Sequence, residues 1–210
     1  VAEDAATLEI EVLREPIGKQ DHYAAAMGGI NVLRFNPDHS VVVEPLHLGY
    51  QKFIGLEKHL LLFFTGIKRD ASSVLSEQRV NIPDRFEMLQ KMANMVEPFK
   101  KALSQGDFKS LGGILAQGWE LKKQLASGVT NPTIDDLYRA GISAGAWGGK
   151  LLGAGGGGCI LFIADPGTHT AIRTAIGAAA ARQQLADYVE VPVKFVHSGV
   201  EVLLNSKTTV

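Results

Sequence analysis

The chain has 210 residues, of which 46% are hydrophobic, and its 21 Lys and Arg against 22 Asp and Glu give a formal net charge of −1. This balance excludes a global electrostatic attraction to nucleic acids or anionic membranes, and the composition is that of a globular protein. Because Cys159 is the single cysteine and the apolar runs are shorter than the roughly 18 residues of a membrane span, we expect a cytoplasmic protein.

The first part of the chain predicts a helix, a loop and a hairpin. Hydrophobic residues recur at helical spacing over 2–14, and the following segment, 18–23, is expected to be a loop. Two β-rich runs separated by turn residues then predict a hairpin over 30–35 and 40–46. An apolar run predicts a buried strand over 59–65.

Helical patterns dominate the middle of the chain, and strands return near its end. Helices are expected over 70–80, 84–105 with a kink at Pro98, 108–127, 133–145 and 168–185. Strands are expected over 159–164, 189–196 and 199–204, whereas the residues up to Lys150 are expected to be helical or loop-like. This order predicts an α+β fold in which helices cover a predominantly antiparallel sheet.

Glycine, with 23 residues in total, is concentrated between positions 145 and 158. The run 153–158 fits the G-x-G-x-x-G pattern, but a dinucleotide-binding site needs a strand before it and a helix after it, and the order predicted here is the reverse. A Walker A loop is excluded because Cys159 follows the last glycine. Backbone amides without Cβ atoms can instead meet phosphate oxygens or another backbone, and a flexible loop is the alternative.

A second candidate site surrounds Asp21, which stands between Lys19 and His22. A carboxylate near a cation is typical of the group that activates a hydroxyl in phosphoryl transfer. Taken alone, the same pattern also describes solvated surface charges.

Both candidate sites carry a family resemblance. Residues 15–29, EPIGKQDHYAAAMGG, resemble the catalytic-aspartate segment of the GHMP small-molecule kinases, and residues 149–158, GKLLGAGGGG, resemble their glycine-rich third motif. Within that family, residues 65–78, TGIKRDASSVLSEQ, and the first segment are similar to sugar kinases that phosphorylate D-glycero-D-manno-heptose 7-phosphate at its anomeric hydroxyl. The resemblance extends over about 8–204, although His22 stands where these sugar kinases usually carry Gln.

The resemblance implies two domains with ATP and sugar between them. Residues 1–50 would be the tail of a ribosomal-protein-S5 domain-2-like N-terminal domain, and residues 51–210 a ferredoxin-like C-terminal domain. The family's Ser-Ser loop, which cradles the ATP phosphates, is absent, because Ser72 and Ser73 lack the accompanying glycines. The chain therefore looks like a C-terminal part, and we expect negligible ATP turnover from these 210 residues alone.

The resemblance also implies a reaction and a set of site residues. The γ-phosphoryl group of ATP, used with Mg²⁺, would pass to the heptose phosphate to give its 1,7-bisphosphate, in nucleotide-activated heptose and polysaccharide biosynthesis. Asp21 would accept the hydroxyl proton, Lys19 would offset negative charge, and no metal ligand is assigned to this chain. The substrate-binding residues would be Gln20, His22, Tyr23, Gly28, Gly29 and Arg69, and the phosphate or ATP-site loop would contain Lys150, Gly153, Gly155, Gly156, Gly157 and Gly158.

Several alternatives stay open. Another kinase of this family could act on galactose, fucose or a mevalonate-pathway alcohol, and a homologue could bind sugar and ATP without chemistry. A nicotinamide oxidoreductase is the least favoured, because of the predicted elements around the glycine run. The expected partners are a small-molecule sugar phosphate and ATP, without nucleic acid or membrane, and a homo-oligomer is an open possibility.

Overall fold

The computed structural model describes residues 1–69 and 71–201. The chain divides into two compact units: unit 1 contains Val1–His47 and Phe195–Val210, and unit 2 contains Leu48–Lys194. A boundary near residue 50 was expected, but the return of residues 195–201 to unit 1 was not. Assignment of the two units to the two domains of the kinase family stays a prediction.

Unit 1 begins with a helix, as predicted, and contains a second helix that was not. The first is α1 (Ala2–Thr7), which continues as a π-helical turn over Leu8–Val12. The predicted loop after Gly18 is wrong beyond Lys19, because Gln20–Met27 form α2. Consecutive alanines favour this helix, and Gly28 ends it with a φ of 65°.

The predicted hairpin of unit 1 is confirmed. Strands β1 (Asn31–Phe35) and β2 (Val41–Pro45) pair antiparallel, with Leu33 opposite Val43. The predicted strand 199–204 is wrong for its described residues, since Val200 N–H donates to the Ala26 carbonyl at 3.1 Å instead of extending a sheet. Residues 202–204 lie outside the described residues.

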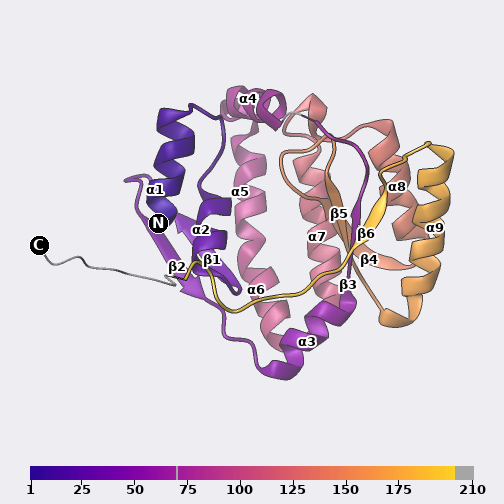
Figure 1. Ribbon diagram of the computed structural model, residues 1–210. Helices are drawn as coiled ribbons and strands as arrows, with labels where there is room; N and C mark the ends of the chain where they lie inside the picture. The colour runs from indigo at the N-terminus through magenta and orange to yellow at the C-terminus, as the bar shows by residue number, and fades with distance from the viewer. Residues whose placement is uncertain (70, 202–210) are drawn as a thin grey trace, which may run out of the picture. The chain divides into compact units, whose positions relative to one another are not determined.

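Unit 2 contains a four-stranded antiparallel sheet with the order β4-β5-β3-β6 (Figure 1). Its strands are β3 (Leu60–Phe64), β4 (Ala146–Leu151), β5 (Cys159–Ala164) and β6 (Val189–Val191). The expectation of a helical or loop-like segment up to Lys150 is wrong, because β4 pairs there with β5. Its two central glycines conceal the alternation by which a strand is recognised in sequence.

The described residues of unit 2 form one α-helix before β3, five α-helices between β3 and β4, and one α-helix between β5 and β6. They are α3 (Tyr50–His59), α4 (Ala71–Asn81), α5 (Phe86–Asn94), α6 (Val96–Gln105), α7 (Phe108–Lys122), α8 (Pro132–Ser143) and α9 (His169–Arg182). The predicted helix 84–105 divides at Met95 instead of kinking at Pro98, which is tolerated in the first turn of α6 because no intrahelical bond is lost there. Throughout the described chain, every helix is too short or too polar to cross a bilayer.

The chain order β3, helices, β4, β5, α9, β6 is a β-α-β-β-α-β pattern with additional helices in its first connection. This arrangement confirms the predicted α+β class and the ferredoxin-like C-terminal fold. One face of the sheet is covered by α8 and α9 (Figure 1). The core between them contains Phe63, Phe162, Ile134, Leu137, Ile172 and Ile176.

Helix α7 lies directly against β4, and two glycines make this approach possible. A Cβ on Gly148 would lie 1.8 Å from the carbonyl oxygen of Gly112, and a Cβ on Gly112 would lie 2.7 Å from the Cβ of Trp147. Neither atom could be accommodated without a shift of the helix from the strand.

The contrast between Gly112 and its neighbour tests this constraint. Gly112→Ala should lower the free energy of unfolding by about 1–3 kcal/mol, because the added methyl group overlaps Trp147. Gly113→Ala is the matched control, since its Cβ would meet nothing within 4 Å, and it should raise stability by about 0.5–1 kcal/mol through helix propensity. Urea unfolding measures both changes, and equal effects of the two substitutions would refute the packing argument.

Candidate active site

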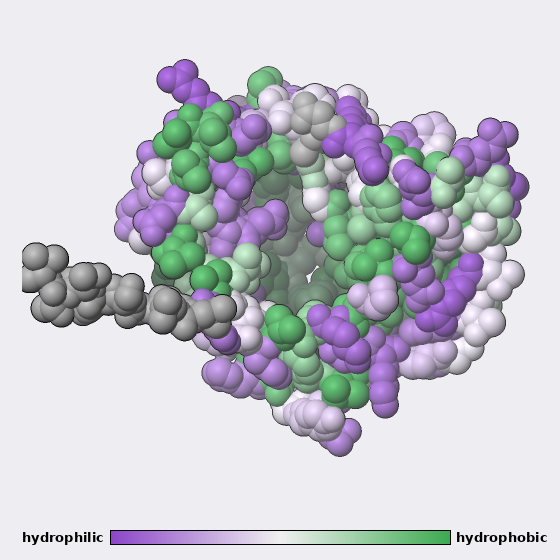
Figure 2. Space-filling model, in the orientation of Figure 1, coloured by the Kyte–Doolittle hydropathy of each residue, from purple (hydrophilic) through white to green (hydrophobic). Residues whose placement is uncertain are grey.

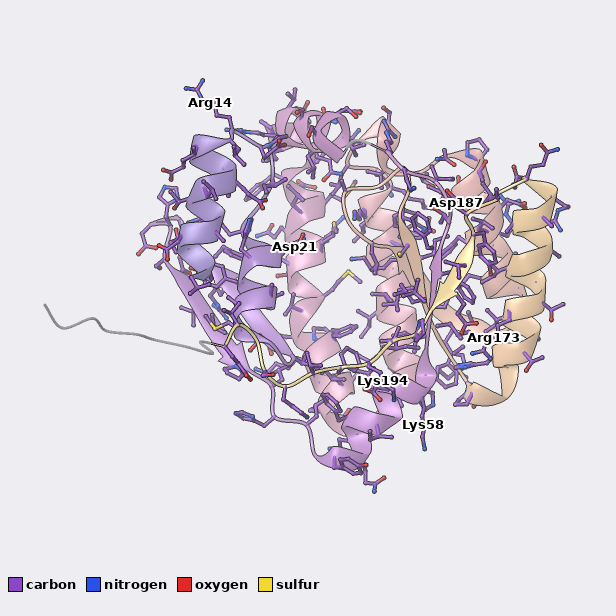
Figure 3. All side chains as sticks on the ribbon, viewed as in Figure 1. Arg14, Asp21, Lys58, Arg173, Asp187 and Lys194 are labelled. Carbon is purple, nitrogen blue, oxygen red and sulfur yellow. The ribbon has the colours of Figure 1, made fainter. Side chains whose placement is uncertain are left out.

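Asp21, the predicted catalytic carboxylate, is exposed in the first turn of α2 (Figure 3). The positive end of the helix dipole favours a negative charge at this position. Within residues 1–69 and 71–201, the Asp21 carboxylate has no hydrogen-bond or ion-pair partner. Its oxygens are therefore available to a ligand.

Lys19 does not pair with Asp21. Its ammonium group donates to the Glu3 carboxylate in α1, and this mutual hydrogen bond raises the pKa of Lys19 and lowers that of Glu3. The reason is helical geometry, because positions two apart point to different sides of a helix. The predicted charge-offsetting role of Lys19 beside Asp21 thus receives no support from the geometry of unit 1.

His22 and Tyr23 also face the first helical segment. The Tyr23 hydroxyl donates to the Glu3 carboxylate at 2.8 Å, which raises the tyrosine pKa, and His22 Nε2 lies 3.2 Å from a carboxylate oxygen of Glu9. In the described residues, the buried Nδ1 of His22 has no hydrogen-bond partner. Both predicted sugar contacts are therefore engaged in packing within unit 1, whereas Gln20 is exposed.

The glycine pair after α2 joins the returning end of the chain to unit 1. A Cβ on Gly28 would lie 2.3 Å from the backbone nitrogen of Gly199, and Gly29 N–H donates to the Val196 carbonyl at 3.0 Å. Both glycines have a φ of 65°. Their observed contacts are structural, and substrate binding by them stays a prediction.

The glycine loop between β4 and β5 is held by hydrogen bonds on two sides. Gly156 N–H donates to the Val129 carbonyl at 2.9 Å, and Gly158 N–H donates to the Ile67 carbonyl at 3.0 Å. The Thr65 hydroxyl, which is buried, donates to the Gly158 carbonyl at 2.8 Å. Because these hydrogen bonds fix the loop on two sides, the alternative interpretation of the glycine run as a flexible loop is disfavoured.

Three successive glycines have no room for a side chain. A Cβ on Gly155 would lie 2.6 Å from the Cα of Val129, and one on Gly157 would lie 2.6 Å from the Ile67 carbonyl oxygen. A Cβ on Gly156 would lie 2.4 Å from Nη1 of Arg69. The loop therefore needs glycine for close approach, and Gly153, Gly155, Gly156 and Gly158 also adopt positive φ.

The amides of this loop alternate between those that donate to protein carbonyls and those that do not. Gly156 and Gly158 donate to protein carbonyls, whereas Gly155 and Gly157 N–H donate to no acceptor in the part of the chain that the structure describes. Of these two glycines, Gly155 is buried and Gly157 is partly exposed, so Gly157 has the more accessible amide. Phosphate binding by this loop stays a prediction.

Arg69, a predicted sugar-phosphate contact, lies across the glycine loop. Its Nη1 donates to the Gly128 carbonyl at 2.9 Å, and its side chain occupies the space that a Gly156 side chain would need. Glu77 supports the same turn by accepting bonds from the Ser127 amide at 2.7 Å and hydroxyl at 2.9 Å, which lower its pKa. Arg69 thus has a bracing contact in unit 2.

Lys150 belongs to β4 and not to the loop that follows it. It pairs with Leu161 of β5, and burial lowers its pKa. Its predicted place in the phosphate or ATP-site loop is corrected to the sheet, because β4 extends through Leu151.

Sequence reasoning missed the polar side chains that hold the glycine loop. Gln78 donates to the Ala154 carbonyl at 3.1 Å, and Lys122 donates to the Gly153 carbonyl. Asn131 caps α8 through its Oδ1 and donates from Nδ2 to the Gly156 carbonyl at 3.2 Å. The Asn-Pro sequence indicates the cap, but no local signal indicates contacts with a loop so far along the chain.

The described residues contain no group of three or more His, Cys, Asp or Glu side chains that could hold a metal ion. The Mg²⁺ implied by the resemblance thus finds no ligand cluster there, and no residue of this chain is assigned to it.

Alanine substitutions in the glycine loop test the close contact between Gly156 and Arg69. Gly153→Ala should cost about 1–2 kcal/mol of stability, because φ is 70° but nothing lies within 4 Å of the new Cβ. Gly156→Ala should cost a further 1–3 kcal/mol or so through overlap with Arg69, and this excess should shrink in an Arg69→Ala background. Thermal and urea unfolding measure the stability of Gly153→Ala, Gly156→Ala, Arg69→Ala and the double variant Arg69→Ala/Gly156→Ala. If Gly156→Ala costs as much stability in the Arg69→Ala background as in the wild type, the contact between Gly156 and Arg69 is contradicted.

Comparisons with known proteins agree with this architecture. Residues 99–182 match the family model described as GHMP kinases C terminal. The chain is 33% identical over 169 residues to D-glycero-alpha-D-manno-heptose 7-phosphate kinase of Campylobacter jejuni, covering 78% of this chain and 50% of that protein. It is 30% identical over 173 residues to L-fucokinase/L-fucose-1-P guanylyltransferase of Bacteroides fragilis, covering 74% of this chain and 17% of that protein.

A solved structure shows the same similarity. The crystal structure of a D-glycero-D-manno-heptose 1-phosphate kinase from Bacteriodes thetaiotaomicron matches with a TM-score of 0.62 and 26% identity, covering 94% of this chain and 52% of that one. The chain thus spans about half the length of the heptose-phosphate kinases it matches. The family model, these relatives and the sheet of unit 2 agree that the chain contains the C-terminal domain of a GHMP kinase.

Proposed function

We propose that the protein is an ATP-dependent sugar kinase that phosphorylates the anomeric hydroxyl of D-glycero-D-manno-heptose 7-phosphate. The observation that carries this proposal is Asp21, an exposed carboxylate at the start of α2 that has no partner among the described residues. Its segment resembles the family's catalytic-aspartate motif, and a heptose 7-phosphate kinase is 33% identical to the chain.

In the proposed reaction, the sugar hydroxyl oxygen forms a bond to the γ-phosphorus of ATP while the bond from that phosphorus to the β-phosphate oxygen breaks. The products are the 1,7-bisphosphate and ADP, and the hydroxyl proton passes to the Asp21 carboxylate. Positioning and electrostatic stabilisation supply most of the catalysis in such transfers. The Gly157 amide, which is partly exposed and donates to no acceptor among the described residues, is the group of the glycine loop that would bind a phosphate oxygen.

The substrate assignment predicts a clear ranking. In the full-length protein, kcat/KM for D-glycero-D-manno-heptose 7-phosphate should exceed that for galactose, fucose and mevalonate by at least about 100-fold, because buried polar groups that lose their partners discriminate strongly. Coupled detection of ADP measures the rates, and phosphorus NMR identifies the product. Preference for galactose or fucose would overturn the heptose assignment. Binding of sugar and ATP without ADP release would refute the proposal that the protein is an enzyme.

The role of Asp21 is tested in the same protein. Asp21→Asn should lower kcat about 10²- to 10⁴-fold while ATP binding persists, because the amide cannot accept the hydroxyl proton. Asp84→Asn is the control, since Asp84 is also an exposed carboxylate but lies in a short helical turn of unit 2. An unchanged kcat in Asp21→Asn would remove this residue from the mechanism.

A further inference from the structure

Unit 2 contains a cavity of about 260 Å³ between α5, α6, α7 and β4. Met92 and Met95 enter its lining from the α5 side, Phe99 from α6 and Leu115 from α7. Hydrophobic side chains gather over α5 and α7 (Figure 2). Its volume lies just below the roughly 300 Å³ at which pockets for drug-sized ligands begin, so it suits a smaller molecule.

Among the described residues that line this cavity, Lys150 has the one charged side chain, and the others are hydrophobic or glycine. The register Lys150, Leu161, Leu62 across β4, β5 and β3 places hydrophobic residues beside it on the same face of the sheet. Its side chain is partly buried, and this burial disfavours the charged form of the ammonium group.

No carboxylate among residues 1–69 and 71–201 pairs with Lys150. A partly buried ammonium group without a counter-ion is costly, and an anion brought by a ligand would offset that cost. Charge complementarity therefore selects anionic ligands over neutral and cationic ones.

The helices around the cavity leave hydrophobic surface for the rest of such a ligand. Helix α5 has no fully buried residue, although its hydrophobic side chains share one face. Gly118 of α7 leaves space beside Met95, because a Cβ there would still be 3.8 Å from the Met95 methyl carbon. Methionine side chains adapt readily to aliphatic ligands.

We propose that this cavity binds a small amphiphile, with an anionic head group at Lys150 and an aliphatic body against Met92, Met95 and Phe99. The proposal extends beyond the sugar kinase function and does not rest on it, because neither Asp21 nor the glycine loop takes part. A carboxylate or a phosphate monoester supplies the same head-group chemistry.

Three probes of equal chain length separate charge from hydrophobicity: octanoate, 1-octanol and octylammonium, each measured by titration calorimetry. Wild-type protein should bind octanoate most tightly, and Lys150→Met should weaken octanoate binding about 10- to 100-fold through loss of a charge-assisted hydrogen bond. Binding of 1-octanol should change far less. Equal octanoate affinity in wild type and Lys150→Met would overturn the proposal.

A second pair of variants tests the cavity itself without removing the charge. Gly118→Leu should fill the space beside Met95 and abolish octanoate binding, whereas Gly113→Leu, the same change in the same helix, should leave it intact because nothing lies within 4 Å of that position. Octanoate binding that survives Gly118→Leu would also refute the site.

Methyl-labelled methionine locates the ligand by NMR. The chain contains four methionines, and the signals of Met92 and Met95 should shift with octanoate, whereas that of Met27 in unit 1 should not. Unmoved Met92 and Met95 signals at saturating octanoate would place binding elsewhere and overturn the proposal. Equal affinity for octanol, octanoate and octylammonium would show that the cavity does not select for charge. That result would also contradict the proposal.

Discussion

Between β4 and β5 the backbone passes so close to two other segments that side chains are sterically excluded. Gly155 lies against Val129, and Gly157 lies against the Ile67 carbonyl. This exclusion joins the end of β3, the turn before α8 and the glycine loop into one packed region. Because alternate amides are bonded inward, the remaining amides keep fixed directions, which is what a preorganised phosphate contact requires.

In unit 1, Lys19 and Asp21 are close in sequence but do not pair, because residues two apart lie on different sides of a helix. One face of α2, together with its N-cap, binds the first helical segment through Glu3 and Glu9, and Asp21 takes no part in these contacts. Lys19 and Tyr23 thereby stabilise the packing of the unit, and the Asp21 carboxylate has no partner in the described part of the chain. Helix α2 thus contributes to the stability of unit 1 and also presents Asp21 for the proposed chemistry. In the loop expected from the sequence, Lys19 and Asp21 would lie side by side.

Strand β4 connects the glycine loop with the cavity of unit 2. Its last residues lead into the loop, its Gly148 allows α7 to approach, and its Lys150 lines the hydrophobic cavity. The position of a residue along β4 decides which face of the sheet its side chain lies on, because alternate residues face opposite sides of a sheet. Lys150 therefore belongs with the hydrophobic side chains of α5, α6 and α7, although only two residues separate it from Gly153 in the sequence.

The sequence by itself determined the α+β class, the hairpin of unit 1, the apolar strands β3 and β5, and the three segments that resemble the kinases. These features depend on local periodicity, turn residues and motif wording, all of which a single segment contains. Tertiary structure alone decided that β4 is a strand, that Lys19 binds Glu3 and that Arg69 contacts the turn beside the glycine loop. Each of these depends on a partner distant in the chain, or on backbone pairing that glycines leave without a side-chain pattern.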